Sequence, residues 1–164
     1  MAAIVLAAIL AVGGCREQSP DDYVSLTGKV FIFNYRVATA TYVVTLGKLK
    51  PIPDGATVTG QFENPDGGEP HVVLQKIWPD VQKIVLESPA LTCVRKDRAY
   101  KISVVIKDGD GKALQQVDTT LTSTLDQDIL PDRPLVVGPV YTPNPDLVGH
   151  PDGKLGDAPG ACPQ

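Results

Sequence analysis

The sequence is poor in the side chains that most enzymes use for catalysis. Its 164 residues include only two histidines, His71 and His150, and three cysteines. It contains no Gly-x-Ser-x-Gly turn, the motif that exposes the serine nucleophile of many hydrolases. The Asp-Gly-Asp-Gly run at 108–111 lacks the G-x-x-x-x-G-K-[ST] spacing and the following helix of a phosphate-binding loop. We therefore expect a protein that is not an enzyme and has no catalytic residues. A hydrolase with an unfamiliar site is the minor alternative.

Metal-binding patterns and a basic surface are missing as well. His71, His150 and the cysteines do not have the spacing of a zinc site. Asp108, Asp110 and Asp118 do not match the ligand positions of a helix–loop–helix calcium site, and the residues on either side read as strands. The net charge of −4 and the pI near 5.0 argue against a nucleic-acid partner, which requires a basic face. We expect no metal, no cofactor and no nucleic acid.

Segments with the 3.6-residue period of a helix are also absent, and 15 prolines with 15 glycines indicate many turns. A two-residue period takes their place, clearest where Tyr100, Ile102 and Val104 alternate with polar or less apolar neighbours. We expect strands at eight segments with this pattern, namely 24–34, 40–49, 56–63, 71–78, 83–88, 99–107, 114–123 and 134–141. About seven or eight short strands predict an all-β fold, an immunoglobulin-like antiparallel β-sandwich.

Composition divides the chain into a folded body and a tail. The sandwich is expected over 23–141. Its first strand carries apolar side chains on both faces, so we expect that strand to be covered on both sides. Proline and glycine dominate from residue 142 onward and no periodicity remains. The segment 142–164 is therefore expected to be an irregular tail, held mainly by Cys162.

No apolar run is long enough to cross a membrane. The run at 2–12 is wholly apolar, but it is shorter than the about 20 residues that a membrane-spanning helix needs. It matches the apolar core of a secretory signal peptide. No lysine or arginine precedes it, so either the amino group of Met1 alone supplies the positive charge or the true start lies upstream.

A short motif follows this run, namely Val12, Gly13, Gly14 and Cys15. It resembles the lipobox of bacterial lipoproteins, in which small residues fit a signal peptidase and the cysteine thiol accepts a diacylglyceryl group. Acyl chains such as palmitate often follow on the new amino terminus. The resemblance implies a signal peptide at 1–14, lipidation of Cys15 and a lipidated tether at 15–22. Because Arg16 follows the cysteine where an inner-membrane protein would have aspartate, the resemblance favours the periplasmic face of the outer membrane. A buried N-terminal helix or strand is the alternative.

The cysteine count then predicts a cross-link. If Cys15 carries lipid, Cys93 and Cys162 remain as one pair in an oxidising compartment. We expect a Cys93–Cys162 disulfide that joins the tail to the body and contributes roughly 4 kcal/mol in the chain-entropy model. Two free thiols, one buried and one in the tail, are the alternative.

The remaining candidates for function are surface residues. Tyr35, Tyr42 and Trp78 are expected in the core because they occur in or beside predicted strands, although exposed they would form an aromatic platform for a ligand. The cluster of Arg95, Lys96 and Arg98 is expected to be solvated, with anionic lipid or an acidic partner as the alternative. His71 is expected to be a surface or strand-edge residue.

Two stretches of the body resemble a known family. They are 83–123, with its Tyr-x-Ile-x-Val-x-Ile strand and Asp-Gly turn, and 53–59, Pro-Asp-Gly-Ala-Thr-Val-Thr. Both look like the β-sandwich outer-membrane lipoproteins related to type III secretion pilotins. The resemblance implies a non-catalytic accessory role. We expect a lipid-anchored cell-envelope protein that binds or positions another envelope protein. The alternative is a small-ligand or carbohydrate-binding module that uses Trp78 and nearby tyrosines.

Overall fold

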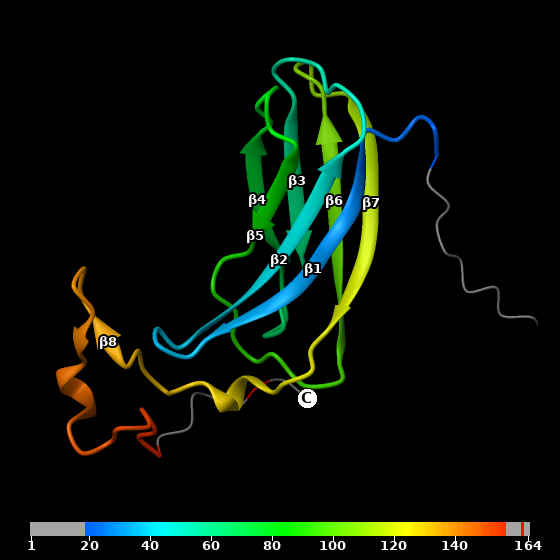
Figure 1. Ribbon diagram of the computed structural model, residues 1–164. Helices are drawn as coiled ribbons and strands as arrows, with labels where there is room; N and C mark the ends of the chain where they lie inside the picture. The colour runs from blue at the N-terminus through cyan, green and yellow to red at the C-terminus, as the bar shows by residue number, and fades with distance from the viewer. Residues whose placement is uncertain (1–18, 157–161, 163–164) are drawn as a thin grey trace, which may run out of the picture.

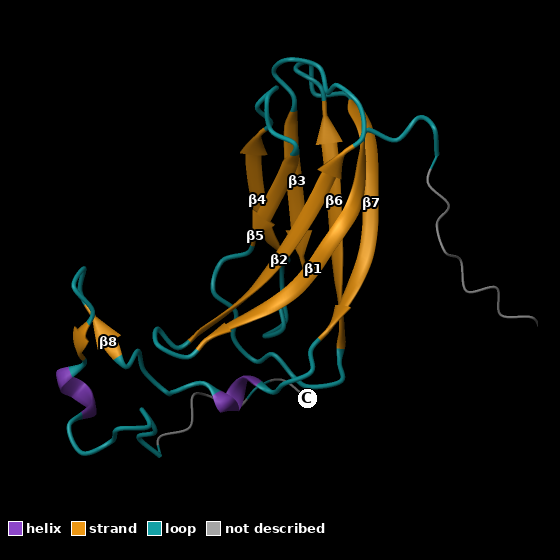
Figure 2. Ribbon diagram, in the orientation of Figure 1, coloured by secondary structure: helices purple, strands orange, loops and turns teal. Residues whose placement is uncertain are grey.

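The computed structural model describes residues 19–156 and Cys162 and shows a sandwich of two antiparallel sheets (Figures 1 and 2). The three-stranded sheet has the order β1-β2-β5, and the four-stranded sheet has the order β4-β3-β6-β7. The strands are β1 (Val24–Asn34), β2 (Thr39–Lys48), β3 (Thr57–Phe62), β4 (His71–Lys76), β5 (Lys83–Glu87), β6 (Ala99–Lys107) and β7 (Ala113–Thr122). The predicted all-β antiparallel sandwich is confirmed.

The core lies between the sheets because alternate residues of each strand point inward. Tyr42 in β2, Phe62 in β3 and Tyr100 in β6 are fully buried and lie at the centre. The rings of Tyr42 and Phe62 stack with their centroids 5.6 Å apart. The Tyr42 hydroxyl donates to the Glu63 carbonyl at 3.1 Å, so its polar atom is satisfied inside the core. Burial raises the pKa of Tyr42 far above its ordinary value, which keeps the phenol neutral.

One side of the sandwich is closed by side chains that bridge β1 and β7. Gln115 in β7 accepts hydrogen bonds from the backbone N–H groups of Tyr23 at 2.7 Å and Val24 at 3.0 Å. Its amide also donates to the Val24 carbonyl at 3.0 Å. Further along the same side, the Lys29 ammonium donates to the Thr119 hydroxyl at 2.8 Å. These bonds satisfy edge groups that would otherwise be unpaired.

The first strand differs from its prediction. Val30 and Ile32 are 50% and 45% exposed, whereas Phe31 and Phe33 on the other face pack against the core. The expectation that β1 is covered on both sides is therefore wrong. In this sandwich each sheet packs on one face only, so an apolar outward face remains in contact with water.

The expected strand at 134–141 is also much shorter than predicted. Only Val136–Val137 (β8) is extended, and it pairs with Thr142–Pro143 (β9) in a separate two-stranded hairpin. Gly138 at φ +72° and Tyr141 at φ +55° turn the chain between them. The sandwich therefore ends with β7.

Among the residues that the structure describes, helical structure is limited to single 3₁₀ turns at η1 (Gln127–Ile129) and η2 (Pro145–Leu147). Over 19–156 there is no helix with the length and apolar character that crossing a membrane would require.

The two ends of the sandwich differ in what they carry (Figure 1). The chain enters at residues 19–23, beside the loops 49–56, 77–82 and 108–112, and we call this the entry end. Residues 131–156, which we call the arm, extend beyond the opposite end and include β8, β9 and η2. The predicted signal peptide, Cys15 and residues 16–18 of the predicted tether lie outside the described residues.

Candidate interaction site

The arm presents large apolar side chains to solvent. Val140 and Val148 are 77% and 83% exposed, and Tyr141 is 59% exposed. Val137 in β8 is 37% exposed on the hairpin that carries Val140 and Tyr141, whereas Val148 follows η2. We call these four residues the arm tip. Large exposed apolar side chains on a projecting element are candidates for protein binding.

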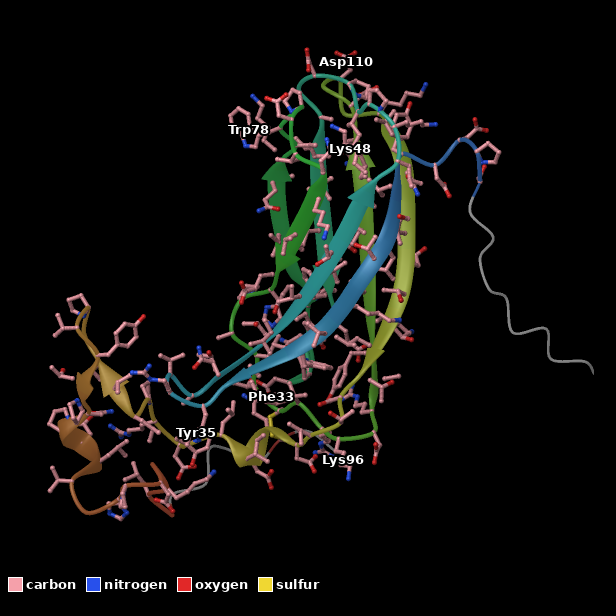
Figure 3. All side chains as sticks on the ribbon, in the orientation of Figure 1. Phe33, Tyr35, Lys48, Trp78, Lys96 and Asp110 are labelled. Carbon is pink, nitrogen blue, oxygen red and sulfur yellow. A yellow bond between two sulfur atoms is a disulfide. The ribbon has the colours of Figure 1, made fainter. Side chains whose placement is uncertain are left out.

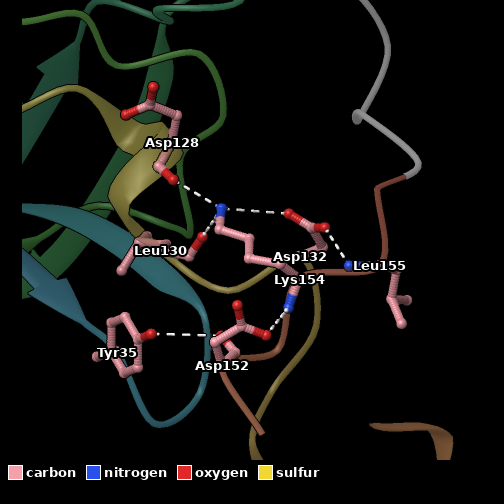
Figure 4. Close-up of polar contacts among 7 residues, drawn as sticks. All are labelled: Tyr35, Asp128, Leu130, Asp132, Asp152, Lys154 and Leu155. Atoms are coloured by element: carbon pink, nitrogen blue, oxygen red, sulfur yellow. Dashed lines mark hydrogen bonds and ion pairs between the residues drawn. The ribbon is translucent and has the colours of Figure 1, made fainter. Parts of the chain in front are cut away.

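The arm is held to the body by Lys154 and Asp132 (Figure 4). The Lys154 ammonium donates to the carbonyls of Asp128 at 2.6 Å and Leu130 at 2.5 Å, and it lies 3.3 Å from Oδ1 of Asp132. Oδ2 of Asp132 accepts from the backbone N–H of Leu155 at 2.8 Å. The Leu155 N–H, followed by Lys154, holds the pKa of Asp132 below its ordinary value. A single cation thereby joins both ends of the arm to η1 and to the residue that follows it.

The turn between β1 and β2 also contacts the arm. The Tyr35 hydroxyl donates to the Asp152 carbonyl at 3.3 Å, a bond drawn in Figure 4. The Arg36 carbonyl accepts from the N–H of Leu135 at 2.9 Å, and the Arg36 guanidinium lies 5.1 Å from the centre of the Tyr141 ring. These contacts hold the arm against the turn between β1 and β2, so the arm is an ordered part of the fold.

The structure joins Cys93 to Cys162 in a disulfide, as expected from the cysteine count, with Cα atoms 5.4 Å apart. Cys93 is half-buried beside the core residue Val94 and has a positive φ of +62°. The Arg95 guanidinium donates to the Cys162 carbonyl at 3.3 Å. The described part of the tail at 142–156 is irregular apart from β9 and η2. Lys154 and Tyr35 hold it as well, so the expectation that Cys162 mainly holds the tail is wrong.

The three candidate aromatics do not meet in one platform. Tyr42 is fully buried, as expected, whereas Tyr35 and Trp78 are 45% and 60% exposed and the core expectation is wrong for them. Trp78 lies two residues past the end of β4, directly before the turn that starts at Pro79, so it is not part of the sheet. Trp78 and Tyr35 lie at opposite ends of the molecule (Figure 3).

The candidate metal and catalytic residues are separated. His71 is half-buried at the start of the edge strand β4, in agreement with its prediction, and His150 is exposed in the arm. The Asp108 carboxylate accepts from two backbone N–H groups of its own turn. The Asp118 carboxylate accepts from the Ser103 hydroxyl at 2.6 Å. Within the described part of the chain, no three His, Cys, Asp or Glu side chains form a group that could hold a metal ion.

A shallow groove crosses the outer face of the four-stranded sheet, with a volume of about 980 Å³. Polar side chains line it, including Gln61, Glu63, Lys101 and Asp118. Arg98 from the predicted basic cluster forms an ion pair with Glu63 at 2.9 Å. Arg95 instead binds the Cys162 carbonyl, so these two guanidinium groups of the cluster have different partners.

Comparison with known proteins identifies no family. No protein-family model matches the chain, and no curated protein sequence does either. Among solved structures, a β-glucuronidase from Bacteroides uniformis is 13% identical with a TM-score of 0.41, and the match covers 61% of this chain and 12% of that one.

A second structure, Bacteroides uniformis β-glucuronidase 2 covalently bound to cyclophellitol-6-carboxylate aziridine, has a TM-score of 0.40 at the same identity and coverage. An endonuclease/exonuclease/phosphatase from Beutenbergia cavernae is 14% identical with a TM-score of 0.30, covering 58% of this chain and 27% of that one. The chain thus spans about one eighth of the glucuronidases that it matches. These likenesses carry no argument about function.

Proposed function

We propose that this chain is a non-catalytic lipoprotein of the bacterial cell envelope that binds a protein partner through its arm tip. Lipid on Cys15 anchors it, with the periplasmic face of the outer membrane as the favoured location, and the sandwich holds the arm away from the anchor. The observation that carries the proposal is the exposure of Val140, Tyr141 and Val148 on a segment that is fixed to the sandwich.

The arm is suited to binding because it is ordered before a partner arrives. Freezing a mobile loop on binding costs conformational entropy, and a loop that is already fixed avoids that cost. The contacts of Lys154 with Asp128 and Leu130 and the contact of Tyr35 with Asp152 fix the arm at several points. Tyr141 adopts a positive φ of +55°, a backbone region that non-glycine residues seldom occupy. The Tyr141 ring lies beside the Arg36 guanidinium and remains 59% exposed, so part of it is available as an anchor for a pocket on a partner.

The position of the arm agrees with an anchored protein. The chain enters the sandwich at one end and the arm extends beyond the other (Figure 1). A protein tied to a bilayer through residues before Tyr23 would present the arm tip to components at a distance from that bilayer.

A small-ligand or carbohydrate-binding module is the second candidate. It needs an exposed aromatic ring, and Trp78 is 60% exposed. Neither Tyr35 nor Tyr42 can stack a ligand together with Trp78, because Tyr35 lies at the opposite end of the molecule and Tyr42 is buried (Figure 3). The arm tip is therefore the better supported site.

Two variants test the two parts of the proposal. Replacing Cys15 with Ser should release the chain from the membrane or leave it unprocessed, and normal membrane fractionation of that variant would contradict the anchor. For the binding site, envelopes are crosslinked and the chain is purified with its adducts. Tyr141→Ser should remove a partner that is captured by the unaltered chain, whereas Val72→Ser, an equally exposed apolar position on β4, should retain it. Loss from both variants, or from neither, would contradict binding at the arm tip.

A further inference from the structure

The entry end carries an exposed cluster that the proposed partner-binding role does not use. Its members are Leu49, Trp78 and the lysines Lys48, Lys50 and Lys76. We propose that this cluster lies on the surface of the bilayer that holds the anchor, with Trp78 and Leu49 at the level of the lipid headgroups. This inference rests on the proposed lipid anchor, and it adds a second membrane contact made by the folded domain itself.

Hydrogen bonds connect the cluster to the point where the chain enters. The N–H of Leu49 donates to the Tyr23 carbonyl at 2.9 Å, so Leu49 lies beside the first residue of the sandwich. The Lys48 ammonium donates to the Pro79 carbonyl, which places it next to Trp78. The ammonium of Lys76 lies 4.7 Å from the centre of the Trp78 ring. The cluster is therefore one contiguous surface at the entry end.

The length of the tether keeps this surface near the membrane. Seven residues separate Cys15 from Tyr23. The eight Cα–Cα steps between them cover at most about 3.5 Å each in a fully extended chain, or about 28 Å in all. An anchored molecule cannot move its entry end farther from the bilayer than that. Since Leu49 adjoins Tyr23, the cluster stays within reach of the lipid surface.

The chemistry of the cluster fits a lipid interface. Tryptophan prefers the boundary between headgroups and acyl chains, because its ring is apolar and its N–H is polar. Trp78 is 60% exposed and Leu49 is 47% exposed, so both are available for insertion.

The lysines of the cluster can contact lipid phosphates. Lys48 and Lys50 donate to backbone carbonyls, and no ion pair between described residues neutralises them. Lysine side chains place their stems along an apolar surface and their ammonium groups among anionic headgroups. The segments that form the entry end also carry six aspartates, namely Asp21, Asp22, Asp54, Asp80, Asp108 and Asp110. The net charge of this end is therefore not positive, and insertion of Trp78 and Leu49 supplies most of the binding.

Because Trp78 is the only tryptophan of the chain, its fluorescence reports on this surface alone. The lipidated full chain is reconstituted into vesicles of phosphatidylcholine with a minority of phosphatidylglycerol, whose acyl chains are brominated near the headgroup. Bromine quenches tryptophan only at short range. We expect Trp78 to lose about half of its emission relative to vesicles without bromine, which corresponds to a ring at the headgroup boundary.

Two charge reversals provide the matched comparison. Lys50→Glu changes the entry end and should reduce the quenching, whereas Lys96→Glu changes an exposed lysine at the opposite end and should leave it unaltered (Figure 3). Circular dichroism confirms that both variants fold. If the chain floats with the vesicles but its emission is equal with and without bromine, the membrane contact is refuted and the anchor stands. If the chain does not float, both the anchor and the contact are refuted. Equal effects of the two reversals would also contradict a contact at the entry end.

Discussion

Replacing Cys93 and Cys162 with serine should destabilise the protein by about 4 kcal/mol. The cross-linked residues are 69 positions apart, so the bridge closes a loop of about 70 residues in the unfolded chain. The chain-entropy relation gives a loss of about 15 cal/mol/K for a loop of that length, which is about 4 kcal/mol at room temperature. A domain of this size is typically stable by about 5–15 kcal/mol, so the melting temperature should fall by about 10 °C.

Urea unfolding followed by far-ultraviolet circular dichroism measures this change directly. The unaltered chain with and without reductant provides a second route to the same difference, and reductant should have no effect on the double serine variant. Lys154 and Tyr35 continue to hold the arm after the bridge is lost, so the native state should keep its structure. If the free energy of unfolding fell by less than about 1 kcal/mol, the cross-linked segment would already be free to move in the native state without the bridge. That result would refute the reasoning from loop closure.

Three further outcomes are expected. Gln115→Ala should lower the free energy of unfolding by about 2 kcal/mol, because it leaves backbone groups of Tyr23 and Val24 unpaired, whereas Gln116→Ala on the outer face should lower it by less than about 0.5 kcal/mol. Similar costs would contradict the role of Gln115 in closing this side of the sandwich. Lys154→Ala should speed hydrogen exchange and proteolysis within the arm, because it lowers the free energy of local unfolding by about 1–2 kcal/mol after allowance for the partial exposure of Lys154. Lys112→Ala, in an exposed turn, should leave both rates unchanged. The pKa of Asp132 is lower in the folded state than its ordinary value of 3.8, so Asp132 stabilises the arm fully above pH 3.8. This contribution is lost as the pH falls through the lower folded-state pKa. Faster opening of the arm between pH 7 and pH 5, measured by hydrogen exchange, would contradict this.

The strands of the sandwich could be predicted because their inward and outward residues alternate strongly. The segments 24–34 and 99–107 coincide with β1 and β6, and the other sandwich strands differ from prediction by one or two residues at their ends. Alternation is a local property, so one strand suffices to reveal it. Which face of β1 remains exposed depends on how the sheets pack, and the sequence of that strand alone does not contain this information.

The arm could not be predicted, because its order comes from contacts between residues distant in sequence. Lys154 binds carbonyls of Asp128 and Leu130, and Tyr35 binds the Asp152 carbonyl more than a hundred residues away. Proline and glycine give no periodicity from which such contacts could be read. Trp78 differs from its predicted core position for a related reason, since it lies two residues past the end of β4 and is therefore outside the sheet.

The cysteine pair could be predicted from chemistry alone. Removing Cys15 from the count leaves one pair, and the structure joins that pair. The position of the arm beyond the far end of the sandwich could not be predicted from the cysteine count and is known from the structure.

Photo-crosslinking in living cells tests the central claim most directly. A photoreactive amino acid replaces Val140 at the arm tip of the otherwise unaltered chain, and a second chain carries it at Val72 on β4 as the control. The account predicts a discrete adduct with one envelope protein from position 140 and none from position 72. An adduct from position 72 but not from position 140, or no protein adduct from either position in chains that fractionate with the membrane, would contradict it.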